Sequence, residues 1–397
     1  MHQGLPAIYQ RSILREANLL QKDFHFFTTY VLCRCNGMTH EDAYRVSYSC
    51  QHTDDAMYGH TLNFEEGGRF QQTITSWDYE AIDKAVELGL NQSLQHLIMA
   101  PFHFLPGAIK EHQTDKFRET MICRADSPLA QRMMEAVVSA SVHDSSLHRL
   151  GIALHTYGDT WAHQNFSGLF AGFSDNNRIN DAKDVRYLNP ETNREKGYDF
   201  KPRSFFEEFK KHVREAFLEK SEVTKLGHAQ VDTNPDEPYK QWSYYHVQFE
   251  RRIPEQGLMH NWEIFSDAAM RIYSWIDRFL SIHAGKFQRG PVVPWEEIAD
   301  PILKTFKVYA DLDGRCALWQ ERIASGRFGF IQNDLDYNNR KWFYDAVGVD
   351  TPHTPEEKVH RLEGFKDSDW KHFHDAAIYQ RIFLVHRLFP GYGIYCG

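Results

Sequence analysis

The stretch HTYGDTWAH, residues 155–163, is the part of the chain that most constrains its fold and its chemistry. His155, Asp159 and His163 follow one another at intervals of four, within a segment whose residues favour a helix. Each interval turns a helix by about 40°, so the three side chains cover about 80° of one face. Imidazole and carboxylate are the usual ligands of zinc and similar divalent ions. The spacing therefore predicts a helix face that binds a metal.

A second interpretation of this face stays open on the residues alone. The chain has 22 histidines, so the pattern can arise by chance, and the three side chains could form a hydrogen-bonded ladder in a buried polar seam. Gly158 costs about 1 kcal/mol in a helix relative to alanine, which predicts the close approach of another backbone at this position. Apolar neighbours such as Leu154 and Trp161 give the face low-dielectric surroundings and favour the metal.

Composition limits the class of protein. The chain has 397 residues, of which 42% are hydrophobic and 14% aromatic, enough for a substantial core. A net charge of −9 argues against a broad binding surface for duplex nucleic acid. The six cysteines form no CxxC pair, as expected for reduced thiols. Because no secretory signal and no run of about 20 apolar residues is present, we expect a cytoplasmic protein without a transmembrane segment.

Helical patterns dominate the sequence, and strand signals are few and short. We therefore expect an all-α protein with a single multi-helix domain. Residues 1–170 would form the helical core with the metal-site motifs, and 171–256 a polar excursion with one amphipathic helix near Phe205–Leu218. Residues 257–397 would add C-terminal helices to the same domain. The helices expected elsewhere are Ile13–Asn36, His40–Gln51 capped by Thr39, Tyr79–Leu97, one capped by Ser127, one from Ser145 or Ser146, Gln256–Ala284 and Asp367–Phe389.

Other polar residues could join the motif. Asp54 and Asp55 are adjacent carboxylates that either face water at a helix end or meet a cation. His103 lies in an apolar loop between two prolines, where it is either a hydrogen-bonded core residue or a ligand. His25 in the first helix is either a ligand or a polar residue at a helix boundary. His148 lies seven residues before His155, on almost the same helix face. It could be a further metal ligand, or it could form a hydrogen bond that orients one of the ligands.

Signatures of other chemistries are absent from the sequence. It has no GxGxxG motif after a strand, no GK[ST] phosphate loop and no GxSxG elbow. No glutamate follows His155, so the HExxH pattern of zinc proteases is missing as well. Carboxylates and imidazoles without cysteine suit hydrolytic rather than electron-transfer metals.

The motif and four further blocks resemble an uncharacterised domain family of microbial proteins, clearly over roughly residues 20–168 and diffusely over the rest of the chain. The blocks are Asp23-Phe24-His25, Gln51 through Asp55, Phe102-His103-Phe104-Leu105-Pro106 and Gln164-Asn165-Phe166-Ser167-Gly168. More distantly, the arrangement is similar to the superfamily of zinc-dependent phospholipases C and single-strand-specific nucleases. Those proteins are all-helical phosphodiesterases that bind up to three zinc ions. One of their helices contributes His-x3-Asp, which His155 and Asp159 match. Those proteins also use an aspartate near the end of an earlier helix, to which Asp54 or Asp55 would correspond, and a loop histidine, to which His103 would correspond.

The resemblance implies a metal-dependent phosphoester hydrolase that binds one or two divalent ions, and zinc is the ion expected. A water activated by the metal would attack phosphorus, and Asp55 and Asp159 would be the catalytic carboxylates, with Asp55 orienting the water. The implied metal ligands are His25, Asp54, Asp55, His103, His155, Asp159 and His163.

A small phosphoester or a phospholipid is the favoured substrate, because the chain is rich in aromatic residues and negatively charged. Two alternatives remain: a single-strand nuclease or nucleotidase of the same fold, and a non-catalytic helical protein with a structural metal. The number of ligands separates these classes, because four protein ligands close a structural site and three leave an open position for catalysis.

Overall fold

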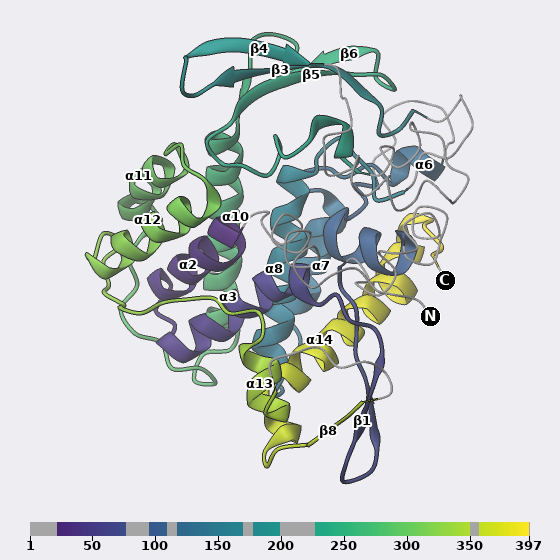
Figure 1. The fold of residues 1–397 in the computed structure, drawn as a ribbon, viewed down its shortest axis with the longest axis vertical. Helices are drawn as coiled ribbons and strands as arrows, with labels where there is room; N and C mark the ends of the chain where they lie inside the picture. The colour runs from purple at the N-terminus through teal and green to yellow at the C-terminus, as the bar shows by residue number, and fades with distance from the viewer. Residues whose placement is uncertain are drawn as a thin grey trace.

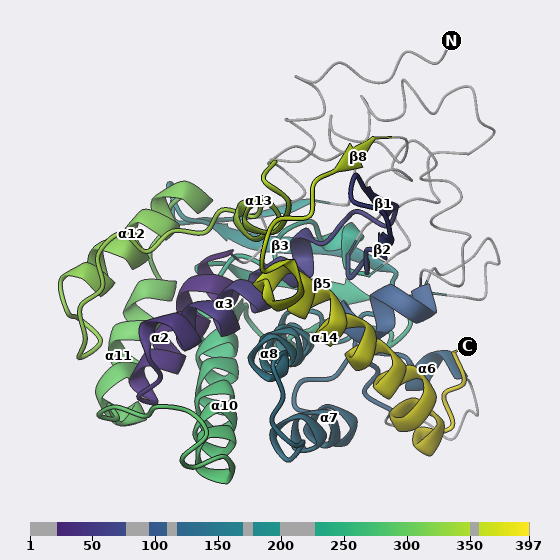
Figure 2. The ribbon, with the colours of Figure 1, turned by 90° about the horizontal axis from the view of Figure 1, so that it is seen from below.

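The computed structural model describes residues 22–76, 95–108, 117–169, 178–198, 227–349 and 357–396. Helix α8 (Ser146–Ala162) runs through the centre, and all of its residues are buried (Figures 1 and 2). Because no face of α8 reaches solvent, its polar side chains must find partners inside the protein. The elements packed around it are α3 (His40–Asp55), α7 (Pro128–Val138), α10 (Asn261–Ile282), α14 (Asp369–Phe383) and the π-helical segment η3 (Gln95–His103).

Capping signals in the sequence fix where two of these helices begin, as expected. The Thr39 side chain accepts a hydrogen bond from the backbone N–H of Asp42 at 3.2 Å, which starts α3. Ser127 accepts one from the N–H of Ala130 at 3.2 Å, with proline in the first turn of α7. Helix α3 continues to Asp55, so both adjacent carboxylates lie in its last turn.

Helices α3 and α8 approach each other closely at Gly151. A Cβ atom at this residue would lie 2.3 Å from the carbonyl oxygen of Val46 and 3.0 Å from the backbone nitrogen of Cys50. The expectation of a close backbone at Gly158 is wrong, because a Cβ there would meet side chains, the nearest being the Phe24 ring at 3.0 Å. The missing side chain that lets the two helices approach is therefore that of Gly151.

The remaining described helices surround this centre. The long helix α10 begins at Asn261 rather than Gln256, because residues 259–260 pair as a strand. The expected helix Phe205–Leu218 lies outside the described residues, as does most of Tyr79–Leu97. None of the described helices has the length and apolar character needed to cross a bilayer. The further helical elements are η1 (Asp23–Thr28), α2 (Thr29–Cys35), α6 (Phe117–Thr120), η5 (Ala229–Val231), α11 (Trp295–Phe306), α12 (Leu312–Ala324), α13 (Lys341–Val347), η6 (Phe365–Asp367), η7 (Leu384–Leu388) and η8 (Phe389–Tyr392).

Two β-sheets show that the all-α expectation is wrong, and the fold is mixed α/β. The first sheet has the order β2-β1-β8, and β8 lies parallel to β1 although the two are far apart in the sequence. The second sheet has the order β4-β3-β5-β6, with β7 also paired to β5, and covers the end of the helical layer (Figure 1). The strands are β1 (Thr61–Phe64), β2 (Arg69–Gln71), β3 (Ala182–Asn189), β4 (Arg194–Tyr198), β5 (Gln241–His246), β6 (Arg251–Ile253), β7 (Met259–His260) and β8 (Lys358–Val359).

Strand β1 alternates as a half-buried strand does but has only four residues, and longer strands lack a clear alternation. In β3 the register shifts between Lys183 and Arg186, and this irregularity interrupts the two-residue period. Strand β4 is almost entirely exposed, so no apolar residues mark it. Most of the second sheet lies within residues 171–256, the stretch expected to be a polar excursion with one helix.

Replacing Gly151 by alanine should destabilise the protein, because the added methyl group has to displace the backbone of α3. We expect the free energy of unfolding to fall by about 1–3 kcal/mol, measured by urea denaturation. Gly391→Ala is the control, since a Cβ there has no neighbour within 4 Å. That control should change stability by less than about 0.5 kcal/mol. Equal stability of the two variants would contradict the role given to Gly151.

Candidate metal centre

Four donor atoms from three elements meet beside α8. Asp54 comes from α3, His103 from the end of η3, and His155 and Asp159 from α8 itself. His155 Nε2 lies 3.1 Å from His103 Nδ1 and 3.3 Å from Asp159 Oδ2. His103 Nδ1 lies 3.3 Å from the same carboxylate oxygen. Asp54 Oδ1 lies 3.6 Å from His155 Nε2 and 3.7 Å from His103 Nδ1. In a tetrahedral zinc site with bonds of about 2.0–2.2 Å, the donors are about 3.3–3.6 Å apart, so these five separations are close to those within one zinc shell.

A second group adjoins the first. It consists of His163, just after α8, with His228 and Asp236 from the segment that precedes β5. Asp236 Oδ1 lies 3.7 Å from His163 Nε2 and 3.6 Å from His228 Nε2. His163 Nδ1 lies 3.6 Å from Asp159 Oδ2, so Asp159 stands between the two groups.

Backbone carbonyls orient three of the imidazole rings. His103 Nε2 donates to the carbonyl of Thr75 at 2.8 Å, and His163 Nδ1 donates to the carbonyl of His103 at 2.8 Å. His228 Nδ1 donates to the carbonyl of Asp232 at 3.1 Å. Each ring therefore presents the lone pair of its other nitrogen to its group. A second ring nitrogen held by an oxygen is the usual arrangement of a metal-binding histidine.

The electrostatics of the first group fit a bound cation. Burial raises the pKa of Asp54 well above its usual range, and the neighbouring Asp159 raises it further. Burial would also raise the pKa of Asp159, but the imidazoles of His155 and His163 hold it well below its usual range. Burial lowers the pKa of His155 to about 3, so this ring is neutral, the form that binds a metal. Two carboxylates that raise each other's pKa are stabilised by a nearby cation.

The second group also has an excess of negative charge. Burial would lower the pKa of His163, but the carboxylates of Asp159 and Asp236 raise it to about 9. The group thus holds a proton at neutral pH when no cation is bound. A divalent ion can take the place of that proton.

The structure places the expected ligands in four different surroundings. Asp54, His103 and His155 form the first group with Asp159 beside them, and His163 belongs to the second. His25 Nε2 donates to Asp159 Oδ1 at 3.1 Å, so His25 holds a carboxylate ligand from behind. The Asp55 carboxylate accepts a hydrogen bond from Tyr337 and belongs to neither group, and His148 is paired with Asp369 at 3.0 Å.

Sequence reasoning missed His228 and Asp236. They lie in the stretch expected to be a polar excursion, eight positions apart and without helical periodicity. No spacing connects them to His163, which precedes them by more than 60 positions. Only the tertiary fold buries Asp236, at 1% exposure, beside the end of α8.

The fold and the site define a mixed α/β protein with adjoining groups of buried histidines and aspartates around one central helix. The chain belongs to a family of unknown function, DUF6765, which it matches over residues 20–388. The expected membership of an uncharacterised domain family is thus confirmed. No curated protein and no solved structure matches the chain.

Exchanging the two adjacent carboxylates one at a time tests which of them binds metal. Asp54→Asn removes a charged donor from the first group, and we expect it to weaken zinc binding at least about 100-fold. Asp55→Asn, the neighbouring control, should retain zinc because Asp55 contacts Tyr337 instead. Elemental analysis of the dialysed proteins and chelator competition measure the difference. Loss of zinc only in Asp55→Asn would contradict the assignment.

Zinc affinity should fall as the pH is lowered. The ion has to displace the proton that burial favours on Asp54 and the one that Asp159 and Asp236 favour on His163. Below the pKa of each group, affinity should drop by up to about tenfold per pH unit for each proton displaced. Chelator competition between pH 6 and pH 9 measures this slope, and an affinity independent of pH would contradict it.

Proposed function

We propose that this protein is a metal-dependent phosphoester hydrolase with two adjoining cation positions. The observation that carries the proposal is the pair of neighbouring groups with three donors each. The first group brings together Asp54, His103 and His155, and Asp159 Oδ2 lies 3.3 Å from both histidines. The second group offers three, namely His163, His228 and Asp236. Three protein ligands leave the fourth position for water or substrate, as in catalytic zinc sites.

The order of the ligands along the chain supports this class of enzyme. A carboxylate from an earlier helix, Asp54, is followed by a histidine before a loop, His103, and then by His155-x3-Asp159 on one helix. The resemblance to zinc-dependent phospholipases C and nucleases implies the same order. This likeness rests on the ligand set alone, and the two sheets distinguish the fold from the all-helical one expected.

Some residues of the centre are fully buried and would bind the ions, whereas others are partly exposed and would face the substrate. Bound divalent ions would acidify a water and polarise the phosphoryl oxygens. The side chain of Asp159 is 2% exposed and that of His155 0%, whereas Asp54 is 24% and His228 14% exposed. The centre is therefore accessible from the side of Asp54 and His228. Two adjacent cations suit the oxygens of a phosphate ester, and the net charge of −9 favours small or headgroup substrates over duplex nucleic acid.

Hydrolysis by the zinc-loaded protein tests the proposal. We expect cleavage of bis(4-nitrophenyl) phosphate, and Asp236→Asn should lower kcat at least about 100-fold because the open position loses a ligand. The control is Asp267→Asn, since Asp267 accepts a hydrogen bond from Trp161 on α8 at 2.8 Å but belongs to neither group. Phosphatidylcholine micelles and a single-stranded oligonucleotide, assayed in parallel, separate the lipase and nuclease forms of the activity.

A structural metal site predicts a different result. The wild type would then bind zinc at full stoichiometry, lose stability when zinc is removed, and hydrolyse none of the three substrates. That combination would overturn the proposed activity and leave the metal centre in place.

A further inference from the structure

His155 differs from the other histidines of the centre. His103, His163 and His228 each give their second ring nitrogen to a backbone carbonyl. His155 Nδ1 is buried and has no hydrogen-bond partner, and the residue is 0% exposed. A metal-binding histidine almost always has an oxygen at this position. His155 Nδ1 therefore lacks the oxygen partner that the other three histidines have, and we looked for a metal ligand on this side of the ring.

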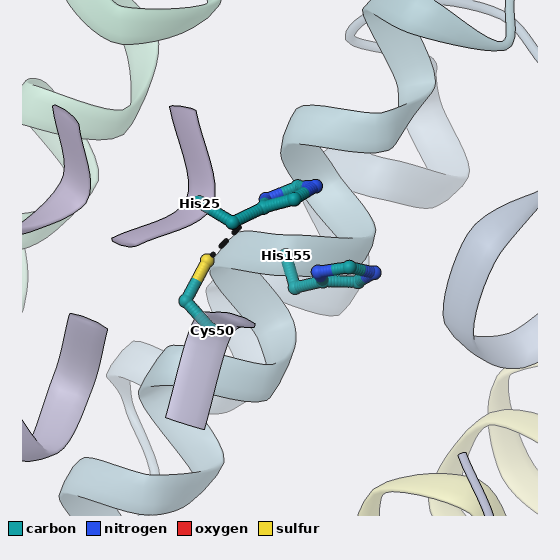
Figure 3. A group of neighbouring side chains, drawn as sticks. All are labelled: His25, Cys50 and His155. Carbon is teal, nitrogen blue, oxygen red and sulfur yellow. Dashed lines mark hydrogen bonds between the residues drawn. The ribbon is translucent and has the colours of Figure 1, made fainter. Parts of the chain in front are cut away.

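A thiol and a second imidazole lie on that side of His155. The rings of His25 and His155 are 4.0 Å apart between centroids and inclined by 32°. Figure 3 shows one nitrogen of each ring on the side where the Cys50 sulfur lies. Cys50 Sγ is 3.6 Å from His25 Nδ1, and ligand atoms of the three residues all lie within 4.8 Å of one another. With zinc-type bond lengths, a sulfur and a nitrogen on one metal are about 3.6–3.8 Å apart.

The tautomer of His25 leaves a lone pair for a metal. His25 Nε2 donates to Asp159 Oδ1, so the unprotonated nitrogen of a neutral His25 ring is Nδ1, which faces Cys50. All three residues are at most 1% exposed. Without an ion, the Cys50 thiol donates to His25 Nδ1, and His155 Nδ1 is left over.

We propose that His25 Nδ1, Cys50 Sγ and His155 Nδ1 form a site for a soft monovalent cation, Cu(I), behind the first group of the metal centre. Thiolate and imidazole are ligands that copper(I) favours. Copper(I) and one thiolate are together neutral, and none of the three ligand residues carries a second negative charge for a divalent ion. Cu(I) binds as such: the Cys50 S–H bond breaks, its proton leaves to solvent, a sulfur–copper bond forms, and nothing is oxidised or reduced.

The two sites compete for one imidazole. A neutral His155 ring has one lone pair, which is either on Nε2 for the first group or on Nδ1 for the copper site. Copper(I) therefore removes a ligand from the first group and weakens zinc binding there, and zinc weakens copper binding by the same factor. This antagonism rests on the proposed function, whereas the copper site itself does not.

An anaerobic titration of the full chain with Cu(I), against a chromophoric Cu(I) chelator, tests the site. We expect tight binding of one ion in the wild type, with thiolate-to-copper absorption, and at least tenfold weaker binding in Cys50→Ser. The matched control is Cys123→Ser, because Cys123 is also fully buried and its thiol contacts the Thr160 carbonyl of α8 at 3.9 Å. Equal affinity of Cys50→Ser and Cys123→Ser would overturn the proposal.

Two further measurements keep the inference separate from folding and from the proposed function. X-ray absorption at the copper edge of the wild type should show one sulfur and two nitrogen neighbours, and a shell without sulfur would overturn the site even if Cys50→Ser fails to fold. The affinity of the protein for zinc should be at least tenfold lower after copper loading than before it. Zinc affinity unchanged by copper would overturn the antagonism alone. Copper binding through Cys50 in a chain that binds no zinc would support the site and overturn the proposed function.

Discussion

A buried negative charge at Asp159 is the constraint around which this structure is organised. The carboxylate lies on a helix with no exposed face, and a charge in such surroundings is tolerated only when it is paired on several sides. One of its oxygens accepts from His25, and the other faces the imidazoles of His103 and His155. A second carboxylate, Asp54, lies beside His103 and His155, and burial raises its pKa. The candidate metal centre is therefore arranged around the one charge of Asp159.

The packing of two helices sets the geometry of this charge. Helix α3 carries Asp54 and Cys50, and α8 carries His155 and Asp159. The separation of the two helices therefore determines how closely these donors approach one another. Gly151 allows that separation to be short, because its missing side chain admits the backbone of α3. A residue with no chemistry of its own therefore sets how closely the donors of the candidate centre approach.

Sequence reasoning worked where one local period carried the information. The spacing from His155 to His163 identified α8, and caps identified where α3 and α7 begin. It could not choose between Asp54 and Asp55, because both lie in the same helical turn and only the position of Tyr337 separates them. Sequence reasoning could not identify His228 and Asp236, because only tertiary packing brings them to His163. The sheets were missed for a related reason: a register shift in β3 and the exposure of β4 erase the period that marks a strand.

The pairing of the early and late parts of the chain has a consequence for biosynthesis. Strand β8 lies against β1, and Tyr337 binds Asp55 across a separation of 282 residues. At the usual rate of translation, the ribosome needs roughly 15–60 s to deliver the late partner after the early one. During that interval Asp55 and strand β1 lack the partners that they have in the finished structure. The contacts that fix this end of α3 beside the candidate centre therefore form only after most of the chain has been made.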